Sequence, residues 1–495
     1  MNTLGNLLWL LIAMPLLGCL ATLFLRSSRA VLHIVSWGVP IISVLSLGTI
    51  FSVFDRAPVF TSGEWLLLDA LSAFHLLGLY IIFSISSVYA GVYFSHEPKE
   101  QELTLPLARR FGALWFATMA TMALVLLSNN LGIMWVGVET TTLVTAFLIC
   151  LHTSAVSLEA TWKYLVVCSV GVAFAFMGIL LIGAAVESPG GVGAHVLQWS
   201  EVVVAAPNIN PQLAKLAFIF LLVGYGTKVG LAPLHSWLPD AHSQAPAPVS
   251  AMFSGFLLNM ALYCIMRYIP IVEQAPGCAG WAHGLLVVLG MVSIGVAAVF
   301  IISQHDLKRL LAYHSVEHLG IIALGLGLGR LGVIAALFHT LNHSICKALG
   351  FFSAGRLGQI YGTHDMRRIS GALSTHPTWG VGMFGSILAL IGVAPFAIFM
   401  SEFLIIKAAV ETKSYWVLAL FLAGAATVFI GALKHAVDMS WGTPSQSVRP
   451  QKASVAERAL VFLPMGALLV LGLWMPPAFW NFLEAAADVL KVPSP

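Results

Sequence analysis

Residues 224–250 read GYGTKVGLAPLHSWLPDAHSQAPAPVS, and this stretch decides how the rest of the chain is interpreted. It ends a long apolar run, yet it contains Lys228, and Gly230 and Pro233 interrupt the helix that the run predicts. A broken helix at membrane depth leaves backbone amides that need protein or water around them. A lysine near the bilayer centre costs about 3 kcal/mol on insertion scales. Both costs fall at one place, which indicates a buried site for a charge that moves.

The composition excludes a soluble protein. Of the 495 residues, 59% are hydrophobic and only 9% are charged, whereas about a quarter of the residues of an average soluble protein are charged. We therefore predict an all-α polytopic membrane protein whose first partner is the lipid bilayer. The net charge of +3 gives no indication of nucleic acid. The six cysteines form no C-x-x-C pair, which argues against iron–sulfur or zinc ligation and against a disulfide framework. We expect no metal, no cofactor, no redox centre and no catalytic residue in this chain.

Apolar segments long enough to cross a bilayer follow one another along the whole sequence. A crossing needs about 20 apolar residues, and this length predicts about fourteen spans, near 5–25, 31–53, 68–94, 111–128, 130–151, 162–186, 213–234, 247–268, 281–303, 307–328, 331–354, 379–406, 415–435 and 456–476. The first segment lacks a basic start and a small-residue cleavage site, so we interpret it as a retained span and not as a signal peptide.

The basic residues predict the orientation. Most of the 24 lysines and arginines lie in loops on one predicted side, and fewer, among them Lys215, Arg267 and Arg330, lie on the other. Because positively charged loops stay in the cytoplasm, this asymmetry predicts that both termini lie outside. Lys228 and Lys347 fall in no loop.

A short motif occurs twice. Residues 230–233 read GLAP and residues 392–395 read GVAP, so Gly392 and Pro395 repeat the break made by Gly230 and Pro233. Each motif lies in the fourth helix of a five-helix set, which predicts discontinuous helices seven and twelve. Five crossings are an odd number, so the second set is inverted relative to the first, and such breaks indicate a transport site near the midplane. We expect spans 1–3 in 1–110, the two repeats in 111–268 and 281–435, and the last span in 436–495.

Several ionisable residues lie inside the predicted spans. Glu139, in LGIMWVGVETTTLV, either packs through hydrogen bonds to the adjacent threonines or pairs with Lys228 and takes part in proton transfer. His339, His343 and Lys347 recur at every fourth position, so they line one face of span eleven. That spacing resembles a zinc helix, but the glutamate of H-E-x-x-H is missing. Haem, or ordinary buried histidines, are the other interpretations.

Three further groups have structural alternatives. His314, Glu317 and His318 follow the interfacial pair Lys308 and Arg309, and they either form a snorkelling pair or continue the polar line.

Glu402, seven residues past Pro395, either pairs with Lys407 or faces the transport path. His235 and Asp240 follow the first break, where Asp240 could cap the turn. Charges at mid-depth are tolerable only along a hydrated path lined by protein. That path is the main inference from the residues.

Four motifs in this order carry a resemblance: KVGLAPLHSWLPDAH, HDLKRLLAYHSVEH, HTLNHSICKALGFF and MSEF. They resemble the antiporter-like membrane subunits of respiratory complex I, multisubunit cation/proton antiporters and membrane-bound hydrogenases. KYLVVCSVG, AYHSVEH and FAIFMSEFLI are most similar to the branch represented by component F of hydrogenase 4 and by formate hydrogenlyase.

The resemblance implies a proton-translocating subunit that has partner subunits in a hydrogenase-type or complex I-like assembly in a bacterial or archaeal inner membrane. It implies a charge pair between Glu139 and Lys228, a centre at His339, His343 and Lys347, and an exit residue at Glu402. Complex I relatives have a lysine in span eight, where this chain has Asn259. The alternatives are a complex I or cation antiporter subunit, which would move protons or sodium, and a non-conducting scaffold for a hydrogenase.

Overall fold

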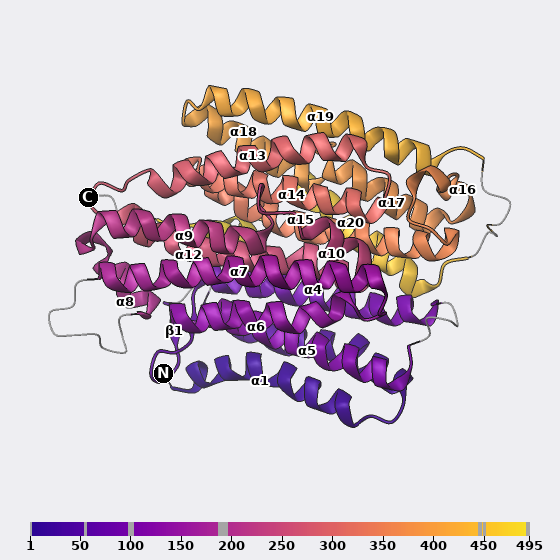
Figure 1. Cartoon of the computed structure of the whole chain (residues 1–495), viewed down its shortest axis with the longest axis horizontal. Helices are drawn as coiled ribbons and strands as arrows, with labels where there is room; N and C mark the ends of the chain where they lie inside the picture. Colours follow the sequence, from indigo (N-terminus) through magenta and orange to yellow (C-terminus); the bar gives the residue numbers. More distant parts are fainter. Residues whose placement is uncertain are drawn as a thin grey trace.

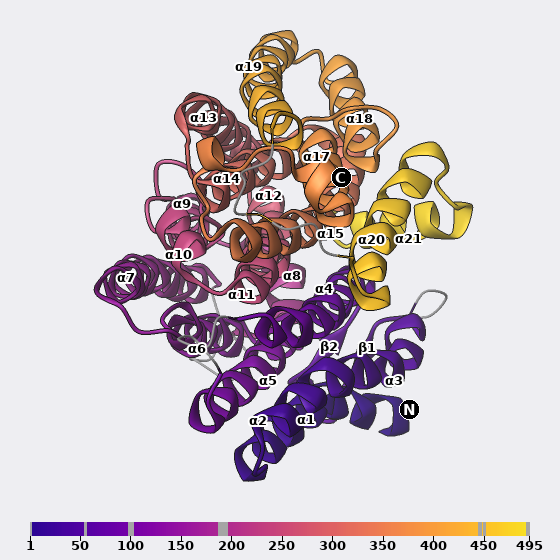
Figure 2. The same ribbon diagram turned by 90° about the vertical axis from the view of Figure 1, so that its right-hand side faces the viewer.

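The computed structural model describes residues 2–53, 57–97, 103–186, 197–443, 448 and 452–491, with side chains from residue 5 onward. The long helices lie side by side with roughly parallel axes (Figure 1). In the view along these axes, α15 (Gly329–Tyr361) lies near the middle of the assembly, between α11 (Ala247–Met252), α14 (Leu307–Leu326) and α17 (Pro377–Leu390) (Figure 2). The prediction of an all-α membrane protein is confirmed.

Within the described residues, eleven helical segments are long and apolar enough to cross a bilayer. Nine of them belong to single helices: α1 (Asn2–Phe24), α4 (Ala70–Ser95), α5 (Leu105–Leu127), α6 (Leu131–Ile149), α7 (Ala155–Ala185), α9 (Pro211–Val229), α13 (Trp281–Ser303), α19 (Tyr415–Ser440) and α20 (Val455–Leu473). The other two contain a π-helical turn: α2 (Ser28–His33) with η1 (Ile34–Gly38) and α3 (Val39–Phe51), and α11 with η5 (Phe253–Leu257) and α12 (Leu258–Gln274).

The remaining elements are more polar or shorter. α14 and α15 contain the buried histidines, and α17 is followed by α18 (Ala397–Glu411). The short elements are α8 (Trp199–Ala205), η4 (Ala206–Asn208), α10 (Leu238–Gln244), η6 (Met366–Arg368), α16 (Ala372–Thr375) and α21 (Pro477–Asp488), and strands β1 (Val59–Phe60) and β2 (Leu67–Leu68) pair antiparallel. α15 runs to Tyr361, beyond the predicted end at 354, because Arg356 is buried in an ion pair with Glu457 of α20 and Gly362 supplies the left-handed residue that ends the helix.

Side-chain caps fix the starts of several helices. Asp69 and Ser72 form a capping box at the start of α4, and Ser154 and Ser157 form another at the start of α7. The Asn130 side chain accepts hydrogen bonds from two amides at the start of α6. These contacts satisfy backbone donors that the first helical turn leaves free.

The helices are broken where the two repeated motifs lie. α9 ends at Gly230, which has φ +83°, and α10 begins at Leu238; α17 is followed by Gly392, which has φ +69°, and α18 begins at Ala397. The Ala232–Pro233 and Ala394–Pro395 peptide bonds are both cis. At the first break, the Ala232 amide donates to the Ser293 hydroxyl of α13, at 2.9 Å. At the first break Leu231 and Ala232 are therefore buried in protein, whereas Pro233 is exposed, as are Ala394 and Pro395 at the second break.

Arg267 corrects the loop assignment made from the sequence. It is buried in α12, where its guanidinium contacts both carboxylate oxygens of Asp69, at 2.5 and 2.8 Å. Its charged carbon also lies 4.5 Å from the centre of the Trp199 ring and 4.9 Å from that of Tyr263. An arginine enclosed in this way is not a free loop charge, because its ion pair and two aromatic faces replace water.

Candidate functional site

The first part of the site lies beside the first helix break. Lys228, fully buried at the end of α9, donates to the Thr142 hydroxyl of α6 at 2.9 Å and to the Tyr164 hydroxyl of α7 at 2.5 Å. Tyr164 also hydrogen-bonds Thr145 at 2.7 Å. Lys228 therefore sits among neutral oxygens contributed by two neighbouring helices.

Glu139 lies one helical turn before Thr142 on α6, but it does not contact Lys228. No ion pair joins the two among the described residues, so the expected direct pair is wrong for this structure. One carboxylate oxygen of Glu139 accepts a hydrogen bond from Ser169 at 2.7 Å, and the other is buried without a protein partner. The partner of Lys228 on α6 is instead the Thr142 hydroxyl.

Asn259 connects the first half of the chain to the centre. Its amide nitrogen donates to the Gly255 carbonyl at 3.0 Å and to the Ser344 hydroxyl of α15 at 2.9 Å. Its side-chain oxygen is buried and has no protein partner. Asn259 thus contacts Ser344, the residue that follows His343 on α15, although its amide cannot titrate.

A file of histidines occupies the centre, between α14, α15 and α18. His318 and His339 share a hydrogen bond of 2.9 Å, and the other nitrogen of His339 lies 2.8 Å from the Ser401 hydroxyl. His314 hydrogen-bonds Glu317 at 2.9 Å. The ring centres of His318 and His343 lie 5.4 Å apart. All five side chains are buried, and the structure brings together the residues that the sequence placed in two separate groups.

Lys347 lies at the same level of burial as Lys228 and also lacks a carboxylate partner. Its ammonium donates to the Leu311 carbonyl of α14 at 2.5 Å, and it forms no ion pair with a described residue. Both ring nitrogens of His343, one turn earlier on α15, are buried without a hydrogen-bond partner. Buried polar atoms are nearly always hydrogen-bonded, and ordered water commonly fills this role.

One part of the centre has the composition of a metal site. The ligand atoms of His314, Glu317 and His318 lie within 4.8 Å of one another. Two imidazoles and a carboxylate are ligands that zinc accepts. His314 and Glu317 already hydrogen-bond each other, and His318 bonds His339. The expectation that the chain binds no metal stays a prediction.

The loop after the first break leads toward one end of the bundle. His235 lies against the Phe300 and Tyr313 rings and has no hydrogen bond to the central file. Asp240 does not simply cap a turn, because it pairs with Lys163 of α7 at 2.5 Å and with Arg309 of α14 at 3.0 Å. His242 stacks on Phe351 of α15, with ring centres 5.1 Å apart, and both its nitrogens are buried without a partner.

A polar cavity of about 620 Å³ opens beside this loop. Its lining includes Ser243, Arg309 and His364, and the Lys308 ammonium donates to the carbonyls of Ser243 and Ala245. Burial and the nearby Lys308 charge lower the pKa of His364 to about 3, so this imidazole is neutral at physiological pH. The cavity therefore reaches Ser243 of α10, which is adjacent to His242 in sequence.

Glu402 lies in α18, after the second break, and its surroundings differ from those of Lys228 at the first break. Glu402 is partly buried and makes no hydrogen bond with a described residue. It faces a mainly apolar cavity of about 450 Å³ between α18 and α19, close to Gly392. The suggested pairing with Lys407 is wrong, because the Lys407 ammonium lies 3.8 Å from Glu411.

Sequence reasoning missed several polar contacts of the site. Tyr164 and Ser169 hold Lys228 and Glu139, Ser401 hydrogen-bonds His339, and His242 lies against α15. Hydroxyl residues are too common in helices to stand out. His242 carried a signal, since it lies in the same interrupted stretch as His235.

Comparisons with known proteins agree with this geometry. The family model described as NADH:quinone oxidoreductase/Mrp antiporter, TM, matches residues 128–429. A hydrogenase-4 component F homolog from Methylacidiphilum infernorum (isolate V4) is 35% identical over 486 residues, which is 97% of this chain and 99% of the relative.

Two solved structures show the same fold. A chain of the membrane-bound sulfane sulfur reductase, an archaeal respiratory membrane complex, superposes with a TM-score of 0.84 at 23% identity and 98% coverage of both chains. A chain of the Mrp complex from Dietzia sp. DQ12-45-1b gives 0.83 at 21% identity, covering 99% of this chain and 98% of its own. The chain is a multi-pass, antiporter-like membrane protein that belongs to the family of NADH:quinone oxidoreductase and Mrp antiporter membrane subunits.

Proposed function

We propose that this chain is the proton-translocating subunit of a membrane-bound, hydrogenase-type respiratory complex. Partner subunits carry out the electron transfer that drives proton movement, and this chain contributes no redox centre. The hydrogenase-type assignment is supported by the relative that matches nearly the full length of both chains. A subunit of a complex I or Mrp-type assembly is the second candidate. The shared family and fold fit both candidates equally.

The proposed topology has fourteen crossings with both termini outside. To the eleven apolar segments it adds α14, α15 and the broken pair α17–α18. The two broken helices then occupy matching places in inverted five-helix repeats. Their shared left-handed glycines, Gly230 and Gly392, support this arrangement.

The observation that carries the proposal is the line of buried, hydrogen-bond-deficient polar atoms along the middle of the bundle. It includes the free oxygens of Glu139 and Asn259 and the free nitrogens of His343, His318 and His314. Direct hydrogen bonds link some members, and water bound at the free atoms would link the others, since such atoms are costly to leave unpaired. Water-linked ionisable groups inside a membrane are the usual elements of a proton relay.

Two lysines on this line supply side chains that can gain and lose a proton. Lys228 and Lys347 are fully buried and bond only neutral oxygens. A buried lysine without a counter-ion loses its proton more readily than one in water, and a carboxylate approaching it favours the protonated form. A small shift of the broken helix α9–α10 relative to α6 would bring Lys228 toward or away from Glu139, and so couple motion to proton binding.

The experiment replaces Lys228 by alanine in the assembled complex. We expect Lys228→Ala to abolish proton translocation into membrane vesicles, while subunit assembly and electron transfer by the partner subunits survive. Arg29→Gln is the matched control, because it removes an exposed positive charge far from the line. Normal translocation by an assembled Lys228→Ala complex would contradict the proposal.

Purification of the tagged chain with its partners identifies the complex. A nickel–iron subunit in the preparation supports the hydrogenase-type assignment, and a flavin-containing NADH-oxidising module supports the second candidate. Proton flux that depends on sodium would assign the antiporter form of that candidate.

A further inference from the structure

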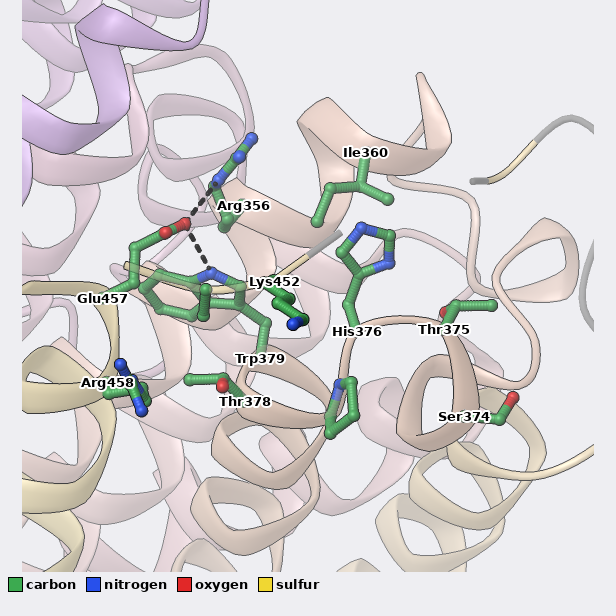
Figure 3. A pocket seen from close by; sticks show the side chains of 12 residues that line it. Arg356, Ile360, Ser374, Thr375, His376, Thr378, Trp379, Lys452, Glu457 and Arg458 are labelled. Carbon is green, nitrogen blue, oxygen red and sulfur yellow. Dashed lines mark hydrogen bonds and ion pairs between the residues drawn. The ribbon is translucent and has the colours of Figure 1, made fainter. Parts of the chain in front are cut away.

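A third cavity lies at one end of the bundle, away from the polar line. It has a volume of about 530 Å³ and is enclosed by the end of α15, the start of α17 and the start of α20. Figure 3 shows the side chains that line it, which include Arg356, His376, Lys452, Glu457 and Arg458. Three cations and one carboxylate line this cavity, so its surroundings are positively charged.

Both oxygens of the Glu457 carboxylate already accept hydrogen bonds from the protein. Glu457 accepts hydrogen bonds from Arg356 at 3.2 Å and from the Trp379 indole at 3.0 Å, and its second oxygen accepts from the Ser454 amide at 2.8 Å. Lys452 and Arg458 form no ion pair with a described residue. The neutralised pair Arg356–Glu457 thus forms the wall, and two cations without partners remain to attract a ligand.

Two further features supply hydrogen-bond donors. His376 is only 5% exposed, lines the cavity and has a ring nitrogen without a partner. It precedes α17, a helix of 14 residues whose start has no side-chain cap. Pro377, the first residue of this helix, has no N–H, so the first amides are those of Thr378 and Trp379, which carry the positive end of the helix dipole and attract anions.

The position of the cavity suits a ligand that comes from the membrane. On α20, Val455 lies one turn before Arg458 and Phe462 lies one turn after it, so the three share a face. Val455 is 76% exposed and Phe462 is 49% exposed. The cationic group therefore lies where an apolar outer surface begins, which is the arrangement of a phosphate headgroup above acyl chains.

We propose that this cavity is a binding site for a phosphate group, supplied by an anionic phospholipid headgroup or by a free phosphate compound. Lys452 and Arg458 attract the charge, and His376 and the first amides of α17 donate hydrogen bonds to the phosphate oxygens. This site is independent of proton movement through the bundle.

The test is a binding titration of the full-length, delipidated chain in a neutral detergent, followed by native mass spectrometry. The ligands are short-chain phosphatidylglycerol, short-chain phosphatidylcholine and inorganic phosphate. We expect phosphatidylglycerol to bind better than phosphatidylcholine. Lys452→Gln with Arg458→Gln should weaken phosphatidylglycerol binding roughly 30-fold, because each basic residue near an anionic headgroup contributes a roughly fivefold effect.

The control removes the same charge elsewhere. Arg26→Gln with Arg29→Gln removes two exposed arginines, one just before α2 and one within it, that do not line the cavity, and should leave binding unchanged. If inorganic phosphate binds as well as the lipid and shows the same loss in the double variant, the phosphate site stands and its source is a free phosphate compound.

Three results would overturn the proposal. The first is equal binding of phosphatidylglycerol and phosphatidylcholine. The second is an equal loss of phosphatidylglycerol binding in the two double variants. The third is that neither phosphatidylglycerol nor inorganic phosphate binds, while Lys452→Gln with Arg458→Gln prevents assembly with partner subunits. The last result would identify the cavity as a protein contact. His376→Gln, which keeps a hydrogen-bond donor, should retain more binding than His376→Leu.

Discussion

Two sets of buried charge in this protein differ in how they are compensated. Near one end of the bundle, Arg267 meets both oxygens of Asp69 and lies between two aromatic rings. Along the middle, Lys228 and Lys347 bond only hydroxyl and carbonyl oxygens. A charge with a full complement of partners is held in one state. We propose that Arg267 is therefore a structural charge and that the two lysines, which have no ion-pair partner, carry protons.

The largest expected effect is on the structural pair. Arg267→Met should lower the free energy of unfolding by about 3–5 kcal/mol, because it leaves the Asp69 carboxylate buried without its partner. Denaturant titration in detergent micelles measures this loss. Arg267→Met combined with Asp69→Asn should recover much of it, since the neutral amide leaves no buried charge and can still accept the capping hydrogen bond from the Ser72 amide. If Arg267→Met lowers the free energy of unfolding by less than about 1 kcal/mol, Arg267 does not differ from the lysines in its contribution to stability.

A backbone substitution at the first break should have the next largest effect. Gly230→Ala should cost at least about 1–2 kcal/mol, because Gly230 has φ +83° and a methyl group there would collide with Leu238. Gly392→Ala forces a similar backbone penalty, but its methyl group meets the movable Glu402 side chain. Gly295→Ala in α13, with open space around it, is the control and should not destabilise the protein. Equal unfolding curves for Gly230→Ala and Gly295→Ala would contradict this explanation.

The lysine of the middle line should behave in the opposite way to Arg267. Lys228→Met should change the free energy of unfolding by less than about 1 kcal/mol, because it removes a buried charge that has no counter-ion. Its former partners stay satisfied, since Tyr164 still bonds Thr145 and the Thr142 hydroxyl still donates to the Val138 carbonyl. The same titration measures this. Destabilisation as large as that of Arg267→Met would mean that Lys228 is a structural charge.

The smallest effect concerns pH and the cavity beside Lys308. The pKa of His364 is lowered from 6.5 to about 3 in the folded protein, mainly by burial. As the pH falls through about 6.5, the unfolded chain therefore binds a proton at this residue that the folded protein does not, and stability decreases down to about pH 3. His364→Gln should flatten this part of the curve of melting temperature against pH. An unchanged curve would show that His364 does not contribute.

The sequence reveals the proposed proton-carrying residues better than the structural ion pair. Lys228, Glu139 and Glu402 stand out because each interrupts an apolar run, and the two breaks are visible as Gly-x-Ala-Pro. The pairing of Arg267 with Asp69 is not visible, because the two residues lie far apart in sequence and Arg267 falls near the end of a span. The helices themselves were predictable from hydrophobic length, although α15 continues past its predicted end because Glu457 neutralises Arg356.

The site was predictable as a set of residues but not as a set of contacts. The expected ion pair of Glu139 with Lys228 failed because Thr142 and Ser169 provide nearer partners. Which hydroxyl faces which charge depends on helix rotation, and one sequence does not determine that rotation. The joining of the two histidine groups through His318 and His339 likewise depends on how α14 packs on α15.

The central claim is that the uncompensated charges carry protons through the bundle. The most direct measurement is proton uptake into vesicles that contain the assembled complex, driven by electron transfer, with Glu139→Gln, Lys228→Ala and Lys347→Ala combined. We expect loss of proton uptake, with electron transfer and subunit composition retained. Unchanged uptake in the assembled triple variant would contradict the account and leave the chain as a membrane scaffold.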